Sequence, residues 1–265
     1  MTRPIPEHPR VPARPFDLAQ FDLREMLRCG IDLRAVTRQA ASVEEAAREV
    51  TAYLYEVARD PVDGSRSCAL VRCFVTRPLG TLDAELQRAA RDAAGGAALF
   101  PDINCLVLLA SIGDEPAWCD RRRSAAHRAI PLTSAEAVRA TPMIAQLIHA
   151  FGVPIEDIVG HADPERLLRA TGGKQYGVFH VASAPGSPYI PAQQEFVGPY
   201  DIRSVLGFGA ALATGDVIAV IMFSRTAIPE STADRFRSVA LELRGCLHRF
   251  GASEVFVGSA DPAVG

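Results

Sequence analysis

Two apolar runs separated by a short polar turn constrain the fold of this chain more than any other feature. Residues 204–212 and 217–224 are almost entirely apolar, and the turn formers Thr214, Gly215 and Asp216 lie between them. A connection this short joins antiparallel neighbours, because parallel strands need a long crossover. Both runs are too apolar for the edge of a sheet in water. We therefore predict a hairpin in the middle of a sheet.

One face of the first predicted strand is nearly bare. Side chains alternate between faces along residues 204–212, so Leu206 and Phe208 share one face while Gly207 and Gly209 share the other. A missing side chain lets another group approach the backbone closely. That group is either a ligand lying on the sheet or a flanking helix, and we favour the helix as the commoner arrangement.

Hydrophobic periodicity outside the hairpin predicts an irregular alternation of helices and strands. Ser42 and Glu45 have the spacing of a capping box at a helix start, and Thr141 is placed to act as an N-cap before Pro142. The predicted helices cover about residues 16–39, 43–57, 81–94, short segments from 133, 141 and 163, and 228–247, and the predicted strands cover 67–76, 104–112, 127–132 and 176–183.

This order predicts an α+β fold with a mainly antiparallel sheet of about six strands, flanked by helices on both faces. The connecting segments are too uneven for regular βαβ repetition. We expect the first and last helices to cover one face and the middle helices to cover the other. Residues 16–250 contain no internal repeat and no convincing linker, so we expect a single domain there. Residues 1–15 carry five prolines and should form a disordered leader, and residues 251–265 should form a flexible tail.

Charge and composition narrow the functional classes. The net charge of −3 provides no field that would draw the chain onto nucleic acid or an anionic membrane. The 28 basic residues include a single lysine, Lys174, which makes individual arginines weak evidence of function. No apolar run approaches the roughly 20 residues that span a bilayer. The start has no secretory signal, and the six cysteines lack a C-x-x-C pair, so we expect free thiols in the cytoplasm.

Five collinear segments resemble motifs of a known family. They are similar to the GAF-like N-terminal sensory region of certain bacterial sensor histidine kinases, over residues 16–250. The resemblance implies a GAF/PAS-like fold and a sensory or regulatory role, with output through a partner such as a histidine kinase. We expect no kinase activity in this chain, because it lacks the phosphoacceptor and ATP-binding boxes of a transmitter. The segments are residues 101–118, 129–132, 142–148, 187–193 and 200–209.

The resemblance supplies no binding residues, so the candidate ligand contacts come from residue chemistry and position. His180 lies in the middle of a predicted strand and could ligate a haem or a metal, since neutral imidazole is a good donor. No further metal ligands stand at diagnostic spacing, and a structural histidine is the favoured alternative. The sequence requires no cofactor and no metal, and it leaves haem or another small ligand open. The candidates are Trp118, His127, His180, Tyr189, Arg203, Gly207 and Gly209.

Cysteine chemistry is the second candidate activity. Cys119 lies between Trp118 and the basic triplet at residues 121–123, where cations would favour a thiolate, so it is the redox candidate. Cys68 and Cys73 are five residues apart on one predicted strand and should point to opposite faces. The triplet itself could bind a phosphate or a carboxylate, or it could be a solvated basic loop.

Three functional hypotheses follow. The first is a non-catalytic sensory domain that binds a small molecule between the sheet and the helices of residues 133–175. Binding would shift the first and last helices, which also suit homodimerisation. The second is a ligand-free scaffold for dimerisation or docking. The third is a haem- or thiol-based redox sensor, or a reductase that uses cysteines. No catalytic motif occurs, so we expect no enzyme and no catalytic residues.

Overall fold

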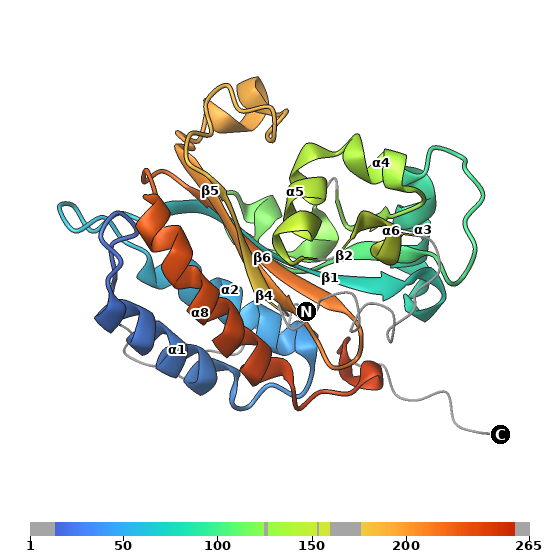
Figure 1. The fold of residues 1–265 in the computed structure, drawn as a ribbon, viewed down its shortest axis with the longest axis horizontal. Helices are drawn as coiled ribbons and strands as arrows, with labels where there is room; N and C mark the ends of the chain where they lie inside the picture. The colour runs from blue at the N-terminus through green and yellow to red at the C-terminus, as the bar shows by residue number, and fades with distance from the viewer. Residues whose placement is uncertain (1–13, 125–126, 153, 160–175, 258–265) are drawn as a thin grey trace, which may run out of the picture.

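A six-stranded antiparallel sheet forms the centre of the molecule (Figure 1). The computed structural model describes residues 14–124, 127–152, 154–159 and 176–257. The predicted leader up to residue 13 and the short helix predicted near residue 163 lie outside the described residues. The strand order is β3-β2-β1-β6-β5-β4, and the α+β class with an antiparallel sheet is confirmed. The strands are β1 (Cys68–Pro78), β2 (Asn104–Gly113), β3 (Ala129–Pro131), β4 (Tyr176–Val181), β5 (Ser204–Ala211) and β6 (Val217–Ser224).

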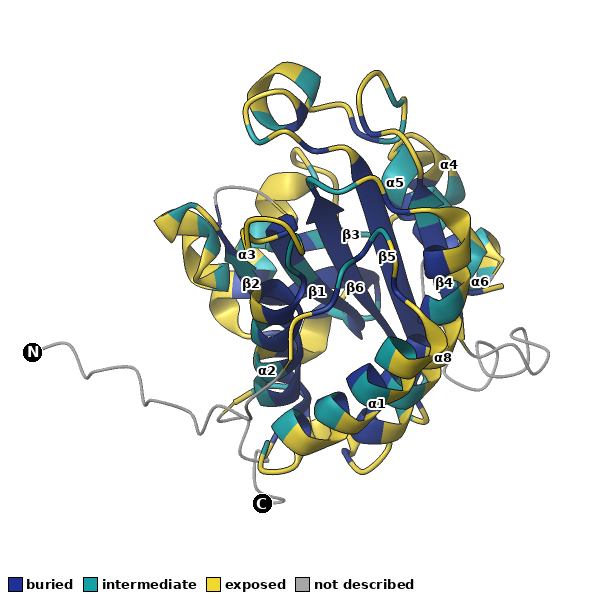
Figure 2. Cartoon of the chain, turned by 90° about the vertical axis from the view of Figure 1, so that its left-hand side faces the viewer, coloured by how far each residue is buried: buried dark blue, intermediate teal, exposed yellow. Residues whose placement is uncertain are grey.

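The predicted hairpin is confirmed as β5 and β6, and it lies inside the sheet. Ser204 pairs with Ser224 at one end and Ala211 with Val217 at the other, and both strands are buried along their whole length (Figure 2). Gly215 adopts a φ of 82° in the connecting turn, a conformation that favours glycine. The short turn and the two-sided burial together place this hairpin between β1 and β4.

Helices cover both faces of the sheet, as predicted, but the helix at residues 84–93 was expected on the other face: its Leu86 and Ala90 join the cluster of the first and last helices. On one face, α1, α2 and α8 form a large core cluster with Leu206, Phe208 and neighbouring strand residues. On the other face, α4, α5, α6 and the segment 184–202 form a second cluster that includes Val205 and Ile221 (Figure 1). The helices are α1 (Leu23–Thr37), α2 (Val43–Val57), α3 (Ala84–Ala93), α4 (Ala135–Arg139), α5 (Pro142–Ala150), α6 (Ile155–Ile158) and α8 (Glu230–Leu247). No helix in the described part of the chain is long and apolar enough to cross a membrane.

The first helix starts later than the sequence predicted. Asp22 and Glu25 form a reciprocal capping box that begins α1 at Leu23 rather than at residue 16. The preceding segment turns at Asp17, whose carboxylate accepts a hydrogen bond from the Ala19 N–H at 2.8 Å, and Phe16 bridges to Ala58. A negatively charged first turn and two satisfied N–H groups explain why the helix starts here.

The predicted capping box at the second helix is formed only in part. The Ser42 hydroxyl accepts a hydrogen bond from the Glu45 N–H at 3.1 Å, as expected. The Glu45 carboxylate, however, accepts from the Ala41 N–H at 2.8 Å instead of reaching the Ser42 N–H. The helix start at Val43 is unaffected, because the serine alone satisfies one orphan donor.

The first half of the predicted tail packs against the start of α2. Val255 is only 1% exposed, and its carbonyl accepts a hydrogen bond from the Glu44 N–H at 2.9 Å. The Val257 N–H donates to the Glu44 carboxylate at 3.0 Å. The folded part of the chain therefore continues to residue 257, beyond the predicted end at residue 250. Residues 258–265 lie outside the described residues.

Glu44 is the buried anchor of this contact. Its carboxylate also accepts a hydrogen bond from the Arg121 guanidinium at 2.8 Å, so the first arginine of the basic triplet is an ion-pair partner and not a solvated loop residue. Burial alone would raise the pKa of Glu44, but Arg121, the Val257 N–H and Arg48 together hold the pKa of this carboxyl below its usual value.

The substitution Glu44→Gln should lower the free energy of unfolding by about 3 kcal/mol at pH 7, because Arg121 would lose its carboxylate partner in a buried site. A carboxyl with a lowered folded-state pKa stabilises the fold above its unfolded pKa of about 4.3, and this contribution is lost as the pH falls through the folded-state value. The difference in the free energy of unfolding between the unmodified protein and Glu44→Gln should therefore shrink as the pH falls from about 5 to about 3.

Urea unfolding at several pH values measures this difference. Glu56→Gln is the matched control, because Glu56 pairs with Arg59 and Arg66 while 48% exposed. The control should change the free energy of unfolding by less than about 1 kcal/mol. Equal losses for the two variants would contradict the anchoring role of Glu44.

Candidate functional site

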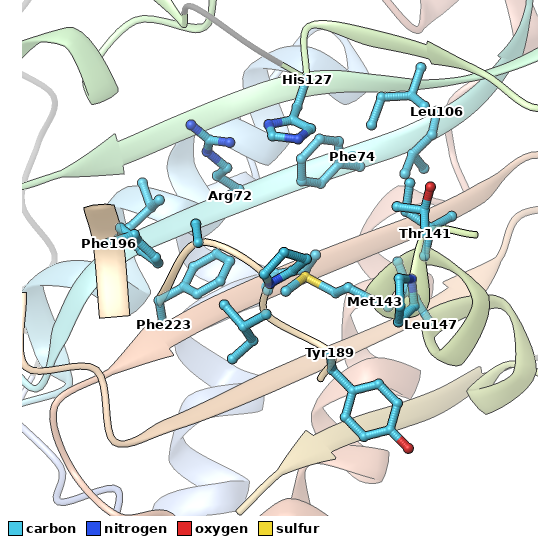
Figure 3. A pocket seen from close by; sticks show the side chains of 18 of the residues that line it. Arg72, Phe74, Leu106, His127, Thr141, Met143, Leu147, Tyr189, Phe196 and Phe223 are labelled. Atoms are coloured by element: carbon cyan, nitrogen blue, oxygen red, sulfur yellow. The ribbon is translucent and has the colours of Figure 1, made fainter. Parts of the chain in front are cut away.

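A cavity of about 330 Å³ lies on the face of the sheet that α5 covers (Figure 3). It is partly open to solvent, and its size falls within the range of small-molecule sites. Its floor is the sheet, and its cover is the start of α5 together with residues 189–196. The lining residues are Leu70, Arg72, Phe74, Leu106, Trp118, His127, Ile130, Thr141, Pro142, Met143, Ile144, Leu147, Tyr189, Ile190, Pro191, Ala192, Phe196, Ile221 and Phe223.

Alternation along the central strands builds the floor. In β1, Leu70, Arg72 and Phe74 share the face that looks into the cavity, and Ile221 and Phe223 of the neighbouring β6 do the same. Their partners in the alternation, such as Val71 and Val220, belong to the opposite core cluster. The cavity floor is therefore a regular sheet surface, which is a rigid support for a ligand.

Aromatic rings form one wall of the cavity. The Trp118 ring lies 5.6 Å from that of Phe196 and 4.6 Å from that of Tyr200, measured between ring centroids. Phe196 also contacts Phe223 edge to face at 5.0 Å. The Tyr200 hydroxyl donates to the Glu115 carboxylate at 2.9 Å, which fixes the wall to the segment after β2.

The side-chain amide of Gln193 holds the cover in place. Its oxygen accepts a hydrogen bond from the Gly186 N–H at 2.8 Å, and its nitrogen donates to the carbonyls of Ile190 at 2.7 Å and Ala184 at 3.1 Å. Gln193 begins a π-helical turn, Gln193–Val197, of a kind that is common at functional sites. Sequence reasoning missed this residue, because nothing local predicts an amide that bridges three loop positions.

Arg72 is the charged group of the cavity, and sequence reasoning missed it as well. Its Nε is buried and has no hydrogen-bond partner among the described residues, and one terminal nitrogen makes a long contact of 3.4 Å to the Ser124 hydroxyl. Burial lowers the pKa of Arg72, and no carboxylate of the described residues opposes that effect. An arginine inside the apolar strand Val71–Val75 was the available signal, but the abundance of arginine in the chain obscured it.

His127 lies beside Arg72 at one end of the cavity (Figure 3). Its backbone φ is 65°, which is uncommon for a residue other than glycine and often marks a functional position. Partial burial, and then the Arg72 cation, lower the pKa of His127, so the imidazole is neutral at pH 7. A neutral imidazole beside a guanidinium can donate a second hydrogen bond to a bound group.

Three of the seven predicted contacts line the cavity: Trp118, His127 and Tyr189. His180 is on the other face, where its Nε2 lies 2.9 Å from the Ile228 carbonyl oxygen, and it is a structural histidine. Arg203 is exposed and pairs with Asp201 at 3.3 Å, so it is wrong as a cavity residue. The sequence suggested His180 and Arg203 by residue chemistry alone. His180 lies away from the cavity because its side chain points to the opposite face of the sheet, and Arg203 because its side chain is exposed at the surface.

The bare face of β5 is filled by protein. A Cβ on Gly207 would meet Leu147 of α5 and Phe179 of β4 at 3.4 Å, and a Cβ on Gly209 would come within 2.0 Å of the Ile218 carbonyl oxygen. Gly207 and Gly209 therefore serve close packing of a helix and of the neighbouring strand, and neither lines the cavity. The expected helix packing occurs, and the cavity lies next to it. Leu147 separates the two regions.

The cap predicted at α5 differs from the structure. Thr141 lines the cavity, but its hydroxyl makes no cap to the helix N–H groups and contacts only the Ala137 carbonyl at 3.4 Å. Pro142 at the first helical position is present as expected, and its missing N–H leaves one orphan donor fewer.

The cysteines are all free thiols. Cys119 is exposed, and its thiol donates to the Gly113 carbonyl at 3.3 Å, while Arg121 of the nearby triplet is engaged with Glu44. The prediction that Cys68 and Cys73 face opposite sides is wrong: an extra residue in β1 shifts the register between Cys68 and Leu70, and both cysteines join the same core cluster. Burial raises the pKa of the Cys68 thiol to about 12, which makes it inert.

Metal binding finds no support within the described residues, where no group of three or more His, Cys, Asp or Glu side chains converges. The scan against models of known protein families finds no match, and the search of curated proteins finds no related sequence. A functional assignment for this chain therefore depends on the geometry of the cavity.

Arg72→Met should raise the free energy of unfolding by about 1 kcal/mol, because it replaces a half-buried guanidinium that has no carboxylate partner among the described residues with an apolar side chain of similar length. Arg77 is a matched control on the same strand. It pairs with buried Asp216 at 3.0 Å, so Arg77→Met should lower the free energy of unfolding by about 3 kcal/mol. Urea unfolding of both variants tests the contrast, and equal destabilisation by both would assign Arg72 a structural role.

Proposed function

We propose that this chain is a non-catalytic, GAF-like sensory or regulatory domain that binds a small molecule in the cavity over β1 and β6. The observation that carries this proposal is a cavity of about 330 Å³ with an apolar lining into which only a few polar groups converge. A ligand-free scaffold would have no need for an unpaired guanidinium on the floor of an open cavity, because that group lowers stability.

The segment between β2 and β3 offers a route from the cavity to the opposite face. Trp118 and His127 of this segment line the cavity. Asp114 accepts a hydrogen bond from the Tyr55 hydroxyl of α2 at 2.6 Å, and Arg121 pairs with Glu44 at the start of the same helix. A ligand that moved this segment would act on α2, and through α2 on α1, against which it packs. This route would carry the signal to a partner such as a histidine kinase.

A second copy of the chain is the partner we propose for α1. Leu23, Leu27 and Ile31 recur at four-residue spacing on this helix, and each is about 60% exposed. Residues at this spacing form one stripe, and a stripe of three large apolar side chains suits an isologous interface in which each copy presents the same surface.

Free thiols and the lack of a membrane-spanning helix in the described residues support a cytoplasmic location.

A larger side chain at the cavity mouth should block ligand binding. Ala192 is exposed and lines the cavity, so Ala192→Trp should fit without disturbing the core and should weaken the binding of any cavity ligand at least about tenfold. Ala97→Trp, at an exposed loop position outside the cavity, is the control and should bind as the unmodified protein does.

A thermal-shift screen of apolar small molecules, followed by titration calorimetry of the hits, measures both variants. Binding to the cavity stabilises the folded state by mass action, so a true ligand should raise the melting temperature of the control and much less that of Ala192→Trp. The sensory proposal would have to be abandoned if no compound shifted the unmodified protein, or if every hit bound both variants equally.

Leu27→Glu should convert the proposed homodimer to a monomer, because it places two like charges in an apolar interface. Light scattering coupled to size-exclusion chromatography measures the mass. Val62→Glu is the control, because Val62 is 92% exposed but lies in the loop after α2. A monomeric unmodified protein, or a dimer that survives Leu27→Glu, would rule out α1 as the interface.

A further inference from the structure

We propose that the cavity selects an apolar carboxylate, whose anionic group pairs with Arg72 while its hydrocarbon body occupies the rest of the space. This inference rests on the proposed function, since it requires that the cavity bind a ligand. It names the chemistry of that ligand and the residue that recognises it.

The positive charge of Arg72 is not balanced by a carboxylate of the described residues. Two other arginines that face a core pair with buried carboxylates: Arg77 pairs with Asp216, and Arg121 pairs with Glu44. Within the part of the chain that the structure describes, Arg72 has no such partner, and none of the described residues that line the cavity is Asp or Glu. A buried guanidinium is costly unless it is paired, so an anion from outside the chain is the group that this position lacks.

The sheet determines where the charge of Arg72 lies. Arg72 projects from the middle of β1, and β2 and β6 flank that strand on both sides. The guanidinium therefore lies on the floor at one end of the cavity, next to the imidazole of His127 (Figure 3). A carboxylate at this end can accept two parallel hydrogen bonds from the guanidinium fork and a third from a neutral imidazole.

The lining determines the rest of the ligand. Beyond Arg72 and His127, the lining is dominated by aliphatic and aromatic side chains. Phe74 lies next to the charged end (Figure 3), and Trp118 packs against Phe196. A sugar or a polyol would lose more hydrogen bonds to water than these walls can replace. A cation would be repelled by Arg72. A single arginine beside a neutral histidine matches one negative charge better than the two charges of a phosphate monoester.

Matched pairs of an acid and its neutral amide test the inference directly, because the two members of each pair have nearly the same shape. We would titrate benzoate and benzamide, 2-naphthoate and 2-naphthamide, and decanoate and decanamide into the full chain by calorimetry. At least one acid should bind at least about tenfold more tightly than its amide at pH 7, as expected for a charge-assisted bidentate hydrogen bond.

Variants assign the preference to Arg72. Arg72→Met should bring the ratio of acid affinity to amide affinity close to one, and Arg72→Lys should restore part of it, because lysine keeps the charge but loses the planar fork. Arg203→Met is the control, since Arg203 is exposed and lies outside the cavity. This control should keep the ratio of the unmodified protein.

The outcomes separate the two proposals. Acids and amides that bind equally well, and that are both blocked by Ala192→Trp, would overturn the carboxylate inference and leave the cavity as a ligand site. A preference for the acid that persists in Arg72→Met would overturn the assignment to this residue. Failure of all six probes to bind would count against the cavity as a ligand site and against the carboxylate with it.

Discussion

Burial of the central strands on both faces is the constraint on which the rest of this structure depends. Every residue of β5 and β6 is buried, so each face of the sheet needs a cover. The three long helices α1, α2 and α8 cover one face with continuous apolar surfaces. The other face is covered by short helices and by an irregular segment, which pack closely over β4 and β5 but leave a cavity over β1 and β6.

The charges in the core follow from the same two-sided burial. A guanidinium buried in a core is costly unless it is paired, and Arg77 and Arg121 each have a carboxylate from a segment distant in sequence. Arg72 enters the face with the incomplete cover, where solvent and a ligand can reach it, and none of the described residues gives it a carboxylate partner. Arg72 is thus the residue that best explains the cavity.

The sequence predicted most of the scaffold and part of the site. Trp118, His127 and Tyr189, which the sequence offered as candidate ligand contacts, line the cavity. Arg72 and Gln193 were missed. The role of Arg72 depends on the absence of a carboxylate partner among the described residues. The role of Gln193 depends on one N–H group and two carbonyls of the surrounding loop. Neither property is visible in local spacing.

Local patterns by themselves determined the hairpin of β5 and β6, the positions of the main helices and the face to which each residue of β5 points, because alternation and helical periodicity act over a few residues. The tertiary structure decided which face holds a cavity, that α5 fills the space at Gly207, that a register shift brings Cys68 and Cys73 to one side, and that residues 251–257 pack on Glu44. The physical reason is that each of these features depends on how closely segments far apart in the sequence approach one another.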